Sequence, residues 1–269
     1  MVIIATSSSL KIIRTATINT NQEALDSVLK KHEVSLRLDA IPTNNLEIIQ
    51  DSQGRDRVKK WIDSKFFGVK HNLSQSDANK YPIYYKNSIN NRPSIFFDNA
   101  DGNTKPLIKN QTSGRSLFDI SSNGASSRIT FFLITYRPQS DSTTRTKIFQ
   151  WKDGNNKIII NIGSNIDFTF NNFSIGGTIA NATIPTNLVK EPMLITITKD
   201  ACPTKIFING DNYYSANACG TNFQQIRAQI NLGGSFNGYV GEIIILKNKL
   251  SDKHREEIEE ILMKKWGII

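Results

Sequence analysis

Residues 236–267 read FNGYVGEIIILKNKLSDKHREEIEEILMKKWG and contain both kinds of element from which the fold is built. Tyr239 to Leu246 is rich in β-branched residues, which predicts a strand. Ser251 can cap a helix after it; glutamates come early in that helix, lysines come late, and Gly267 provides a stop. Its apolar side chains form one stripe, made of Ile258, Ile261, Leu262 and Trp266. We therefore expect a last strand followed by a helix that docks on a sheet.

Short segments with the same strand character fill most of the chain upstream. They alternate with stretches rich in Asn, Gly, Asp and Ser, which favour turns. The expected strands are 34–38, 94–98, 128–136, 146–151, 157–162, 167–173, 193–198, 205–209, 213–215, 228–232 and 239–246. No regular alternation of strand and helix appears. The pattern therefore favours a mostly β protein, an antiparallel two-sheet jelly-roll sandwich, over a parallel α/β sheet.

The composition is that of a folded globular chain. It has 269 residues, of which 38% are hydrophobic, enough for one domain with an appendage. No apolar run approaches the ~20 residues that cross a bilayer, so membrane insertion is not expected. The formal net charge is +9, but lysines and arginines are scattered along the chain. A charged, solvated surface explains this charge better than a nucleic-acid site does.

The segment 1–33 is predicted to be an N-terminal arm with a short helix. Thr20 and Glu23 have capping-box spacing, and apolar residues follow on one face, which predicts a helix over 21–31. Residues 1–16 place their basic residues after an apolar triplet, which reverses the order of a secretory signal. We expect a chain that is already mature or is exported by another route.

The C-terminal stretch 236–267 resembles the end of the laminin-G-like, concanavalin-A-like jelly rolls of bacterial and phage proteins. The resemblance continues upstream, in the same order, with Leu38-Asp39-Ala40, Trp61-Ile62-Asp63 and residues 91–98, NRPSIFFD. It implies a laminin-G-like jelly-roll domain over 34–269. The arm 1–33 has no counterpart in this family, so we expect it to serve assembly or anchoring.

One loop departs from the family pattern. Family members commonly follow the Trp-x-Asp motif with a Ser-Gly-Asn-Gly-type turn, whereas residues 64–68 here read SKFFG. A ligand role of this loop is therefore not carried over from the resemblance. Trp61 and Trp266 are expected to be core or helix-docking anchors. Glu242 either faces solvent on the period of its strand or, as we favour, makes a structural pair.

We expect no enzyme and no catalytic residue. Glycanases of this architecture need a pair of carboxylates ~5 to 10 Å apart, and no predicted strand carries one. His32, His71 and His254 are isolated in sequence, so they indicate neither a zinc site nor a triad, and solvated side chains are expected.

Two candidate ligand sites remain. Asp98, Asn99, Asp101 and Asn103 place oxygen ligands in a loop after a strand, which suits calcium, although such loops are also good turns. No other cofactor is expected. For sugar binding, the candidate exposed aromatic residues are Trp151, Tyr213 and Tyr214.

Cys202 and Cys219 flank a hairpin signal. If Gly210-Asp211 is its two-residue loop, the two cysteines face each other. If Asn209-Gly210 is the loop, Cys202 faces Asn217 and a disulfide needs a bulge. We favour a disulfide, which would indicate an oxidising or extracellular location.

These observations favour a non-enzymatic virion surface protein, a capsid decoration or tail-fibre-associated subunit whose lectin-like jelly roll serves display or binding of host glycans. Virion assembly needs no secretion signal. The expected partners are other virion proteins, further copies of this chain, and cell-surface glycans. The alternative is a secreted bacterial carbohydrate-binding or adhesin module, located outside the cell or at its surface, and the third is a glycan hydrolase.

Overall fold

The computed structural model describes residues 19–41, 43–68, 70–98, 106–109, 128–138, 146–153, 156–171, 178–200, 203–216 and 229–269. The first strands are β1 (Val34–Asp39), β2 (Leu46–Gln50), β3 (Asp56–Trp61), β4 (Leu73–Ser74), β5 (Ile83–Ile89), β6 (Arg92–Phe97), β7 (Leu107–Lys109) and β8 (Ile129–Tyr136). The others are β9 (Thr146–Asp153), β10 (Asn156–Ile162), β11 (Asn165–Asn171), β12 (Thr178–Thr183), β13 (Met193–Lys199), β14 (Thr204–Ile208), β15 (Asp211–Ala216), β16 (Gln229–Leu232) and β17 (Gly238–Leu246). Residues 19–29 are helical, α2 spans Asp252–Trp266, and three short 3₁₀ turns are η1 (Thr43–Asn45), η2 (Ala78–Lys80) and η3 (Thr186–Leu188).

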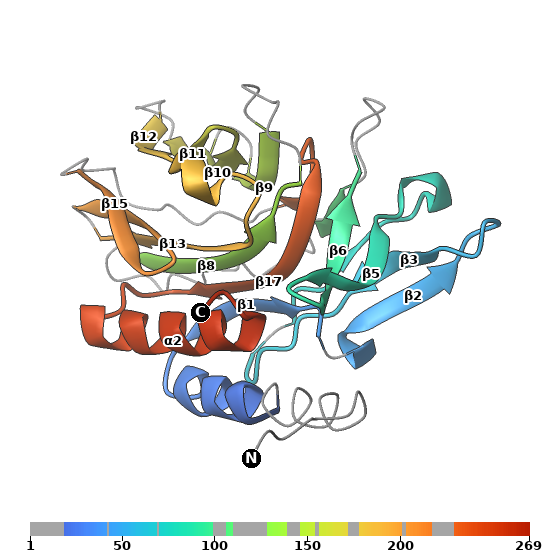
Figure 1. The fold of residues 1–269 in the computed structure, drawn as a ribbon, viewed down its shortest axis with the longest axis horizontal. Coiled ribbons are helices and arrows are strands. Elements are labelled where there is room, and N and C mark those ends of the chain that lie inside the picture. Colours follow the sequence, from blue (N-terminus) through green and yellow to red (C-terminus); the bar gives the residue numbers. More distant parts are fainter. Residues whose placement is uncertain are drawn as a thin grey trace, which may run out of the picture.

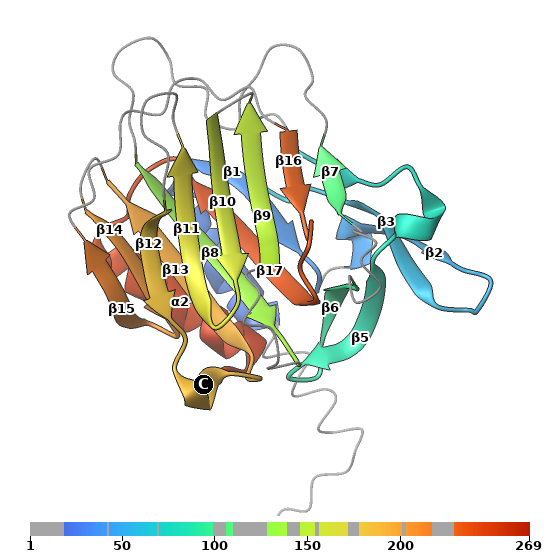
Figure 2. The same ribbon diagram turned by 90° about the horizontal axis from the view of Figure 1, so that it is seen from above.

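The strands pair antiparallel in two facing layers. One layer has the order β1-β17-β8-β13-β14-β15, and the other runs β12-β11-β10-β9-β16-β7-β4-β3-β2. The β5–β6 ribbon joins the layers, because β6 pairs with β17 and β5 pairs with β3. Figure 2 shows β9 to β12 and β16 crossing in front of β8, β13 and β17. The predicted jelly-roll sandwich is confirmed.

Side chains of the shared strands alternate between two hydrophobic clusters. In β8, Phe131 and Leu133 point into the main core between the layers, whereas Phe132 and Ile134 join a second cluster. β17 alternates in the same way. Because these strands are buried on both faces, their sequences are almost continuously apolar.

Helix α2 covers the outer face of the β17–β8–β13 layer through the second cluster (Figure 1). Ser251 caps it by accepting a hydrogen bond from the backbone N–H of His254, and Gly267 ends it in the left-handed conformation. Trp266, Ile258 and Leu262 are buried there, as predicted.

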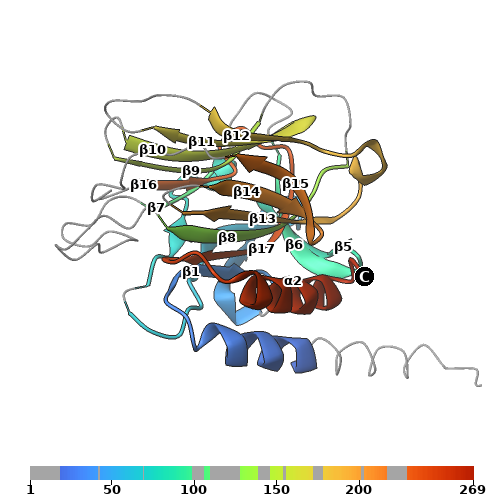
Figure 3. The same cartoon turned by 90° about the vertical axis from the view of Figure 1, so that its left-hand side faces the viewer.

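The N-terminal helix at 19–29 lies beyond α2 and adds Leu25, Val28 and Leu29 to the second cluster (Figure 3). The predicted boundary after residue 33 thus separates this helix from the domain on which it packs. None of the helices in the described ranges is both long and apolar enough to cross a bilayer.

The β14–β15 hairpin turns through Asn209-Gly210, since both residues have positive φ and Ile208 pairs with Asp211. This is the second of the two predicted registers, and the register shifts between Ile206 and Phe207. Cys202 and Cys219 lie outside the described residues, so the disulfide stays a prediction.

Candidate functional site

The loop after β3 is organised by one buried carboxylate. Asp63 Oδ1 accepts hydrogen bonds from the backbone N–H groups of Arg37 and Lys65, each at 3.1 Å, and Oδ2 accepts one from His71 at 2.8 Å. Asn72 Oδ1 in turn accepts from the backbone N–H of Asp63 at 3.0 Å. The loop is therefore fixed at both of its ends and to β1.

In this anchored loop, the side chains of Lys65 and Phe66 point into the protein, whereas that of Phe67 points into solvent. Lys65 is buried and donates from Nζ to the Ser35 carbonyl at 2.8 Å, and burial lowers the pKa of its ammonium group. Phe66 packs against the second cluster, with Lys30 Nζ 5.1 Å and the Arg37 guanidinium carbon 5.5 Å from its ring centre. Phe67 is left 72% exposed.

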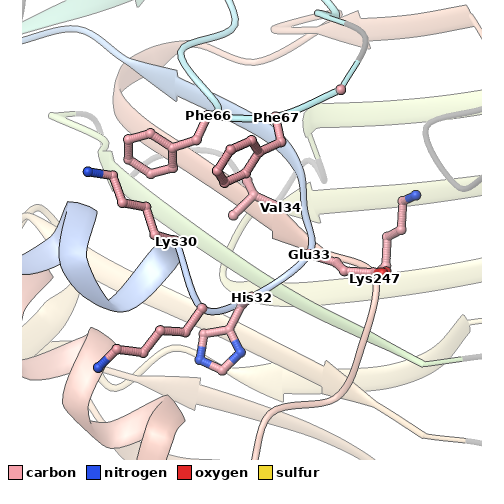
Figure 4. A pocket seen from close by; sticks show the side chains of 9 residues that line it. Lys30, His32, Glu33, Val34, Phe66, Phe67 and Lys247 are labelled. Atoms are coloured by element: carbon pink, nitrogen blue, oxygen red, sulfur yellow. The ribbon is translucent and has the colours of Figure 1, made fainter.

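Phe67 forms one wall of a hollow of about 410 Å³. The other walls come from residues 30–34, which follow the N-terminal helix, and from Lys247, which follows β17. Figure 4 shows the rings of Phe66 and Phe67 side by side, with Lys30 and Lys247 on either side of the hollow. Lys247 and Glu33 are joined by a backbone hydrogen bond of 3.1 Å, which fixes these two walls to each other.

The charge of the hollow is positive. Its lining residues include three lysines, Lys30, Lys31 and Lys247, against one carboxylate, Glu33. Further cations lie behind the loop, where Lys109 Nζ is 2.7 Å from His71 Nδ1. Burial, followed by the nearby charges of Lys65, Lys109 and Lys247, lowers the pKa of His71 to about 3, so this imidazole is neutral at neutral pH and can accept a hydrogen bond from the Lys109 ammonium group.

His32 also lines the hollow, and its ring contacts that of His254 of α2 edge to face, with ring centres 5.1 Å apart. Burial and the neighbouring His254 lower the pKa of His32. An exposed aromatic ring among ammonium groups can stack on the apolar face of a ligand and hold its anionic groups. Among the described lining residues Glu33 is the only carboxylate, so no carboxylate pair of the glycanase kind is assembled there.

The residues of the family motifs mostly form a buried charged cluster instead of a ligand site. Lys265 Nζ donates to Asp39 Oδ2 at 2.5 Å and to Glu242 Oε2 at 2.7 Å, and Trp266 Nε1 donates to the same Glu242 oxygen at 2.9 Å. Glu242 is 1% exposed. The favoured structural pairing of Glu242 is confirmed, and its solvent-facing alternative is wrong because α2 covers this face of β17.

Trp61 is confirmed as a core residue: its indole is fully buried, and Nε1 donates to the Asp39 carbonyl at 3.2 Å. The prediction of solvated histidines is wrong for His71, which is 5% exposed. His71 is enclosed because Asp63 draws its backbone into the loop anchor.

The predicted sugar-binding aromatics do not line the hollow. Trp151 is 1% exposed in β9 and belongs to the main core, so its prediction as an exposed platform is wrong. Its strand carries it on the inward face of the sandwich. Tyr213 on β15 is 39% exposed, and Tyr214 packs partly buried against the main core.

The predicted calcium loop is only partly described. Asp98 directly follows β6, whereas Asn99, Asp101 and Asn103 lie outside the described residues. In the described ranges no group of three His, Cys, Asp or Glu residues is placed to hold a metal. Calcium binding by this loop stays a prediction.

Sequence reasoning missed the residues of the hollow itself. The available signals were the adjacent phenylalanines in SKFFG, where the loop departs from the family, and the dipeptide Lys30-Lys31. Only the fold brings 30–34, 66–68 and Lys247 together.

No family model and no curated protein sequence matches the chain. Solved structures do match in fold. Domain 4 of AbnA, an extracellular GH43 arabinanase from Geobacillus stearothermophilus solved with arabinotriose, is similar with a TM-score of 0.52 and 16% identity, over 86% of this chain and 98% of that one. The receptor-binding domain of botulinum neurotoxin D is similar with a TM-score of 0.58 and 14% identity, over 89% of this chain and 54% of that one.

A second structure of the serotype D domain, in complex with N-acetylneuraminic acid, has a TM-score of 0.57 and 14% identity, over 88% of this chain and 52% of that one. The chain thus spans about half the length of the toxin domains and nearly all of the arabinanase domain. At these identities the likeness shows the β-sandwich fold.

Proposed function

We propose that this chain is a non-catalytic glycan-binding module and that the hollow between 30–34 and 66–68 is its binding site. The observation that carries the proposal is Phe67, a large ring 72% exposed on a loop anchored by a buried carboxylate. This ring lies at the edge of the hollow, where it can stack on the apolar face of a sugar.

The lysines around Phe67 favour an acidic glycan. Lys30, Lys31 and Lys247 can receive a carboxylate or sulfate while the sugar ring stacks on Phe67. The solved neighbours support the class of ligand, since their names record arabinotriose in one and N-acetylneuraminic acid in another. Binding through exposed charges should weaken as salt is added.

The test is a glycan array read with the monomer and with a multimerised form, compared between wild type and Phe67→Ala. We expect weak monomer binding that strengthens on multimerisation, and at least a tenfold loss in the variant, which corresponds to about 1.4 kcal/mol. Tyr213→Ala is the matched control, because Tyr213 is also an exposed aromatic residue but lies on β15, outside the hollow.

Two outcomes would overturn the proposal: equal binding by wild type and Phe67→Ala, or equal losses in both variants. Release of reducing ends from a bound polysaccharide over time would refute the non-catalytic part, for which the support is the missing carboxylate pair in the described lining of the hollow.

We further propose that the domain is of the laminin-G-like type and acts on the surface of a virion, as a capsid decoration or tail-fibre-associated subunit. The sequence motifs and the arm 1–33 support this. Mass spectrometry of purified virions tests it, and absence of the chain there would favour a secreted carbohydrate-binding or adhesin module. That alternative has its own support, because the arabinanase neighbour is extracellular.

A further inference from the structure

Arg137 is a buried arginine without an acidic partner among the described residues. It directly follows β8, is 8% exposed, and makes one hydrogen bond, from Nη1 to the Ile162 carbonyl at 3.3 Å. Its Nε is buried and has no hydrogen-bond partner in the described ranges. Burial lowers the pKa of this guanidinium. A buried charge of this kind is costly unless something pairs with it.

The space beside Arg137 is a cavity of about 70 Å³. It is built from three connections: the end of β8, the β10–β11 turn with Gly163 and Ser164, and the β12–β13 connection. Its lining combines the polar residues Arg137 and Ser164 with the apolar residues Ile184, Val189 and Met193. No carboxylate is among the described lining residues, and Lys190 adds a second cation.

The size and chemistry of this cavity select a class of ligand. One water needs only ~10 to 15 Å³, so the cavity accepts a group of a few non-hydrogen atoms, such as a carboxylate, while a complete sugar ring that carries this group would stay outside the cavity. The planar guanidinium matches a carboxylate with two parallel hydrogen bonds. The aliphatic residues suit the carbon atoms to which such a carboxylate is attached.

We propose that Arg137 anchors the carboxylate of a ligand in this cavity, a second binding site at the other end of the sheet from the Phe67 hollow. β8 and β17 are antiparallel, and Leu246 pairs with Thr130 while Tyr239 pairs with Tyr136. Lys247 and Arg137 therefore lie at opposite ends of this strand pair. The carboxylate belongs either to an acidic sugar or to a small free acid, and both sources present the same group to Arg137.

The experiment is a titration of the full chain with sodium glucuronate and with sodium acetate, against sodium chloride at equal ionic strength. The readout is the NMR signal of the arginine side-chain N–H groups. We expect the Arg137 Nε–H signal to shift saturably with carboxylate and at least tenfold more weakly with chloride. Glucuronate binding tighter than acetate assigns the site to an acidic sugar, and equal binding assigns it to a small free acid.

The variants separate binding from folding. Arg137→Gln should lose binding at least tenfold, and Ser164→Phe should block the cavity while leaving Arg137 in place. The control is Arg128→Gln, which removes the same charge at the other end of β8, where Asp200 already pairs with it at 2.9 Å. If Arg137→Gln does not fold, Ser164→Phe decides.

The proposal is overturned if chloride shifts the signal as strongly as carboxylate, or if Ser164→Phe binds like wild type. Phe67→Ala should leave this titration unchanged. Failure of the Arg137 site and failure of the Phe67 site are thus observed separately.

Discussion

At the scale of single residues, the buried charged side chains determine how strongly a substitution or a change of pH lowers the stability of the protein. Asp39 and Glu242 lie side by side in the paired strands β1 and β17, each at most 1% exposed, and both depend on Lys265 of α2. Burial raises the pKa of Glu242, the charge of Asp39 adds to this, and Lys265 and Arg37 oppose it.

Lys265→Met should therefore cost about 3 to 5 kcal/mol of unfolding free energy, because it removes the cation between two buried carboxylates and leaves Arg37, 3.7 Å from Glu242, as the nearest positive charge to that side chain. Urea titration measures the loss. Lys264→Met is the matched control, since its side chain is 52% exposed and pairs only with Glu260 on the surface. A loss there of more than ~1 kcal/mol, or no difference between the variants, would contradict the prediction.

Glu259 of α2 makes stability depend on pH. Burial raises the pKa of its carboxyl from 4.5 to about 7, against the opposing charge of Arg255. The native state thus holds this proton more tightly than the unfolded chain does, so ionisation costs stability as the pH rises from 4.5 to about 7. The expected contribution is on the order of 3 kcal/mol.

Replacing Glu259 by Gln should remove this fall from the stability curve, measured by urea titrations at several pH values. Glu260→Gln serves as the control, because the side chain of Glu260 is 59% exposed on the same helix. A curve for Glu259→Gln that still follows the wild type between pH 4.5 and 7 would count against the assignment.

At the scale of elements, the final turn of the last helix packs directly on β17. The Trp266 indole is fully buried and also donates to Glu242, and a Cβ on Gly241 would come within 2.5 Å of its ring. β17 therefore carries glycine where the helix approaches most closely. The helix and the strand beneath it form one packed unit.

Trp266→Ala should cost about 3 to 5 kcal/mol, as for other buried large aromatic residues. Trp266→Phe keeps most of the packing and loses the hydrogen bond to Glu242, so a smaller loss is expected. Denaturant titrations give both values. A loss below ~1 kcal/mol for the alanine variant would mean that the helix is peripheral.

At the scale of the whole molecule, the N-terminal helix belongs to the packed structure. Leu25 and Leu29 are fully buried, and Asp26 pairs with Arg37 at 2.7 Å. Residues 30–34 then form a wall of the hollow. Residues 19–33 are thus part of the packed structure and of the wall of the hollow.

Deletion of 1–33 should lower the unfolding free energy and abolish binding in the Phe67 hollow, because it uncovers the second cluster and removes Lys30 and Lys31. Deletion of 1–18 keeps the packed helix, so a smaller loss is expected. Thermal unfolding and glycan binding of the two truncated chains test this. Equal stability of both would show the helix to be dispensable.

The sequence alone determined the class of fold and the ends of its clearest elements. The C-terminal helix is capped by Ser251 and Gly267, as the sequence predicts, because capping is local chemistry that can be recognised from a few neighbouring residues. Strands buried on both faces, such as β8 and β17, also stand out because their residues are almost all apolar.

Other strands left no local signal. β3 reads DRVKKW and β5 reads IYYKNSI, and their polar residues are exposed or half-buried. β12 reads TIANAT, where Ala180 lies opposite Phe168 of β11 and is buried because the large neighbour fills the space. Such strands are stabilised by pairing and packing with their neighbours, and the β-propensity of their own residues does not predict this.

Only the tertiary structure decided where the candidate sites are. Phe67, Lys30 and Lys247 come from three separate segments, and the fold joins them because Asp63 ties the loop to β1 while Glu33 bonds to Lys247. Arg137 becomes unusual only because burial removes its water and no acid among the described residues pairs with it. Exposure and pairing are properties of the packed chain, so no local pattern of residues determines them.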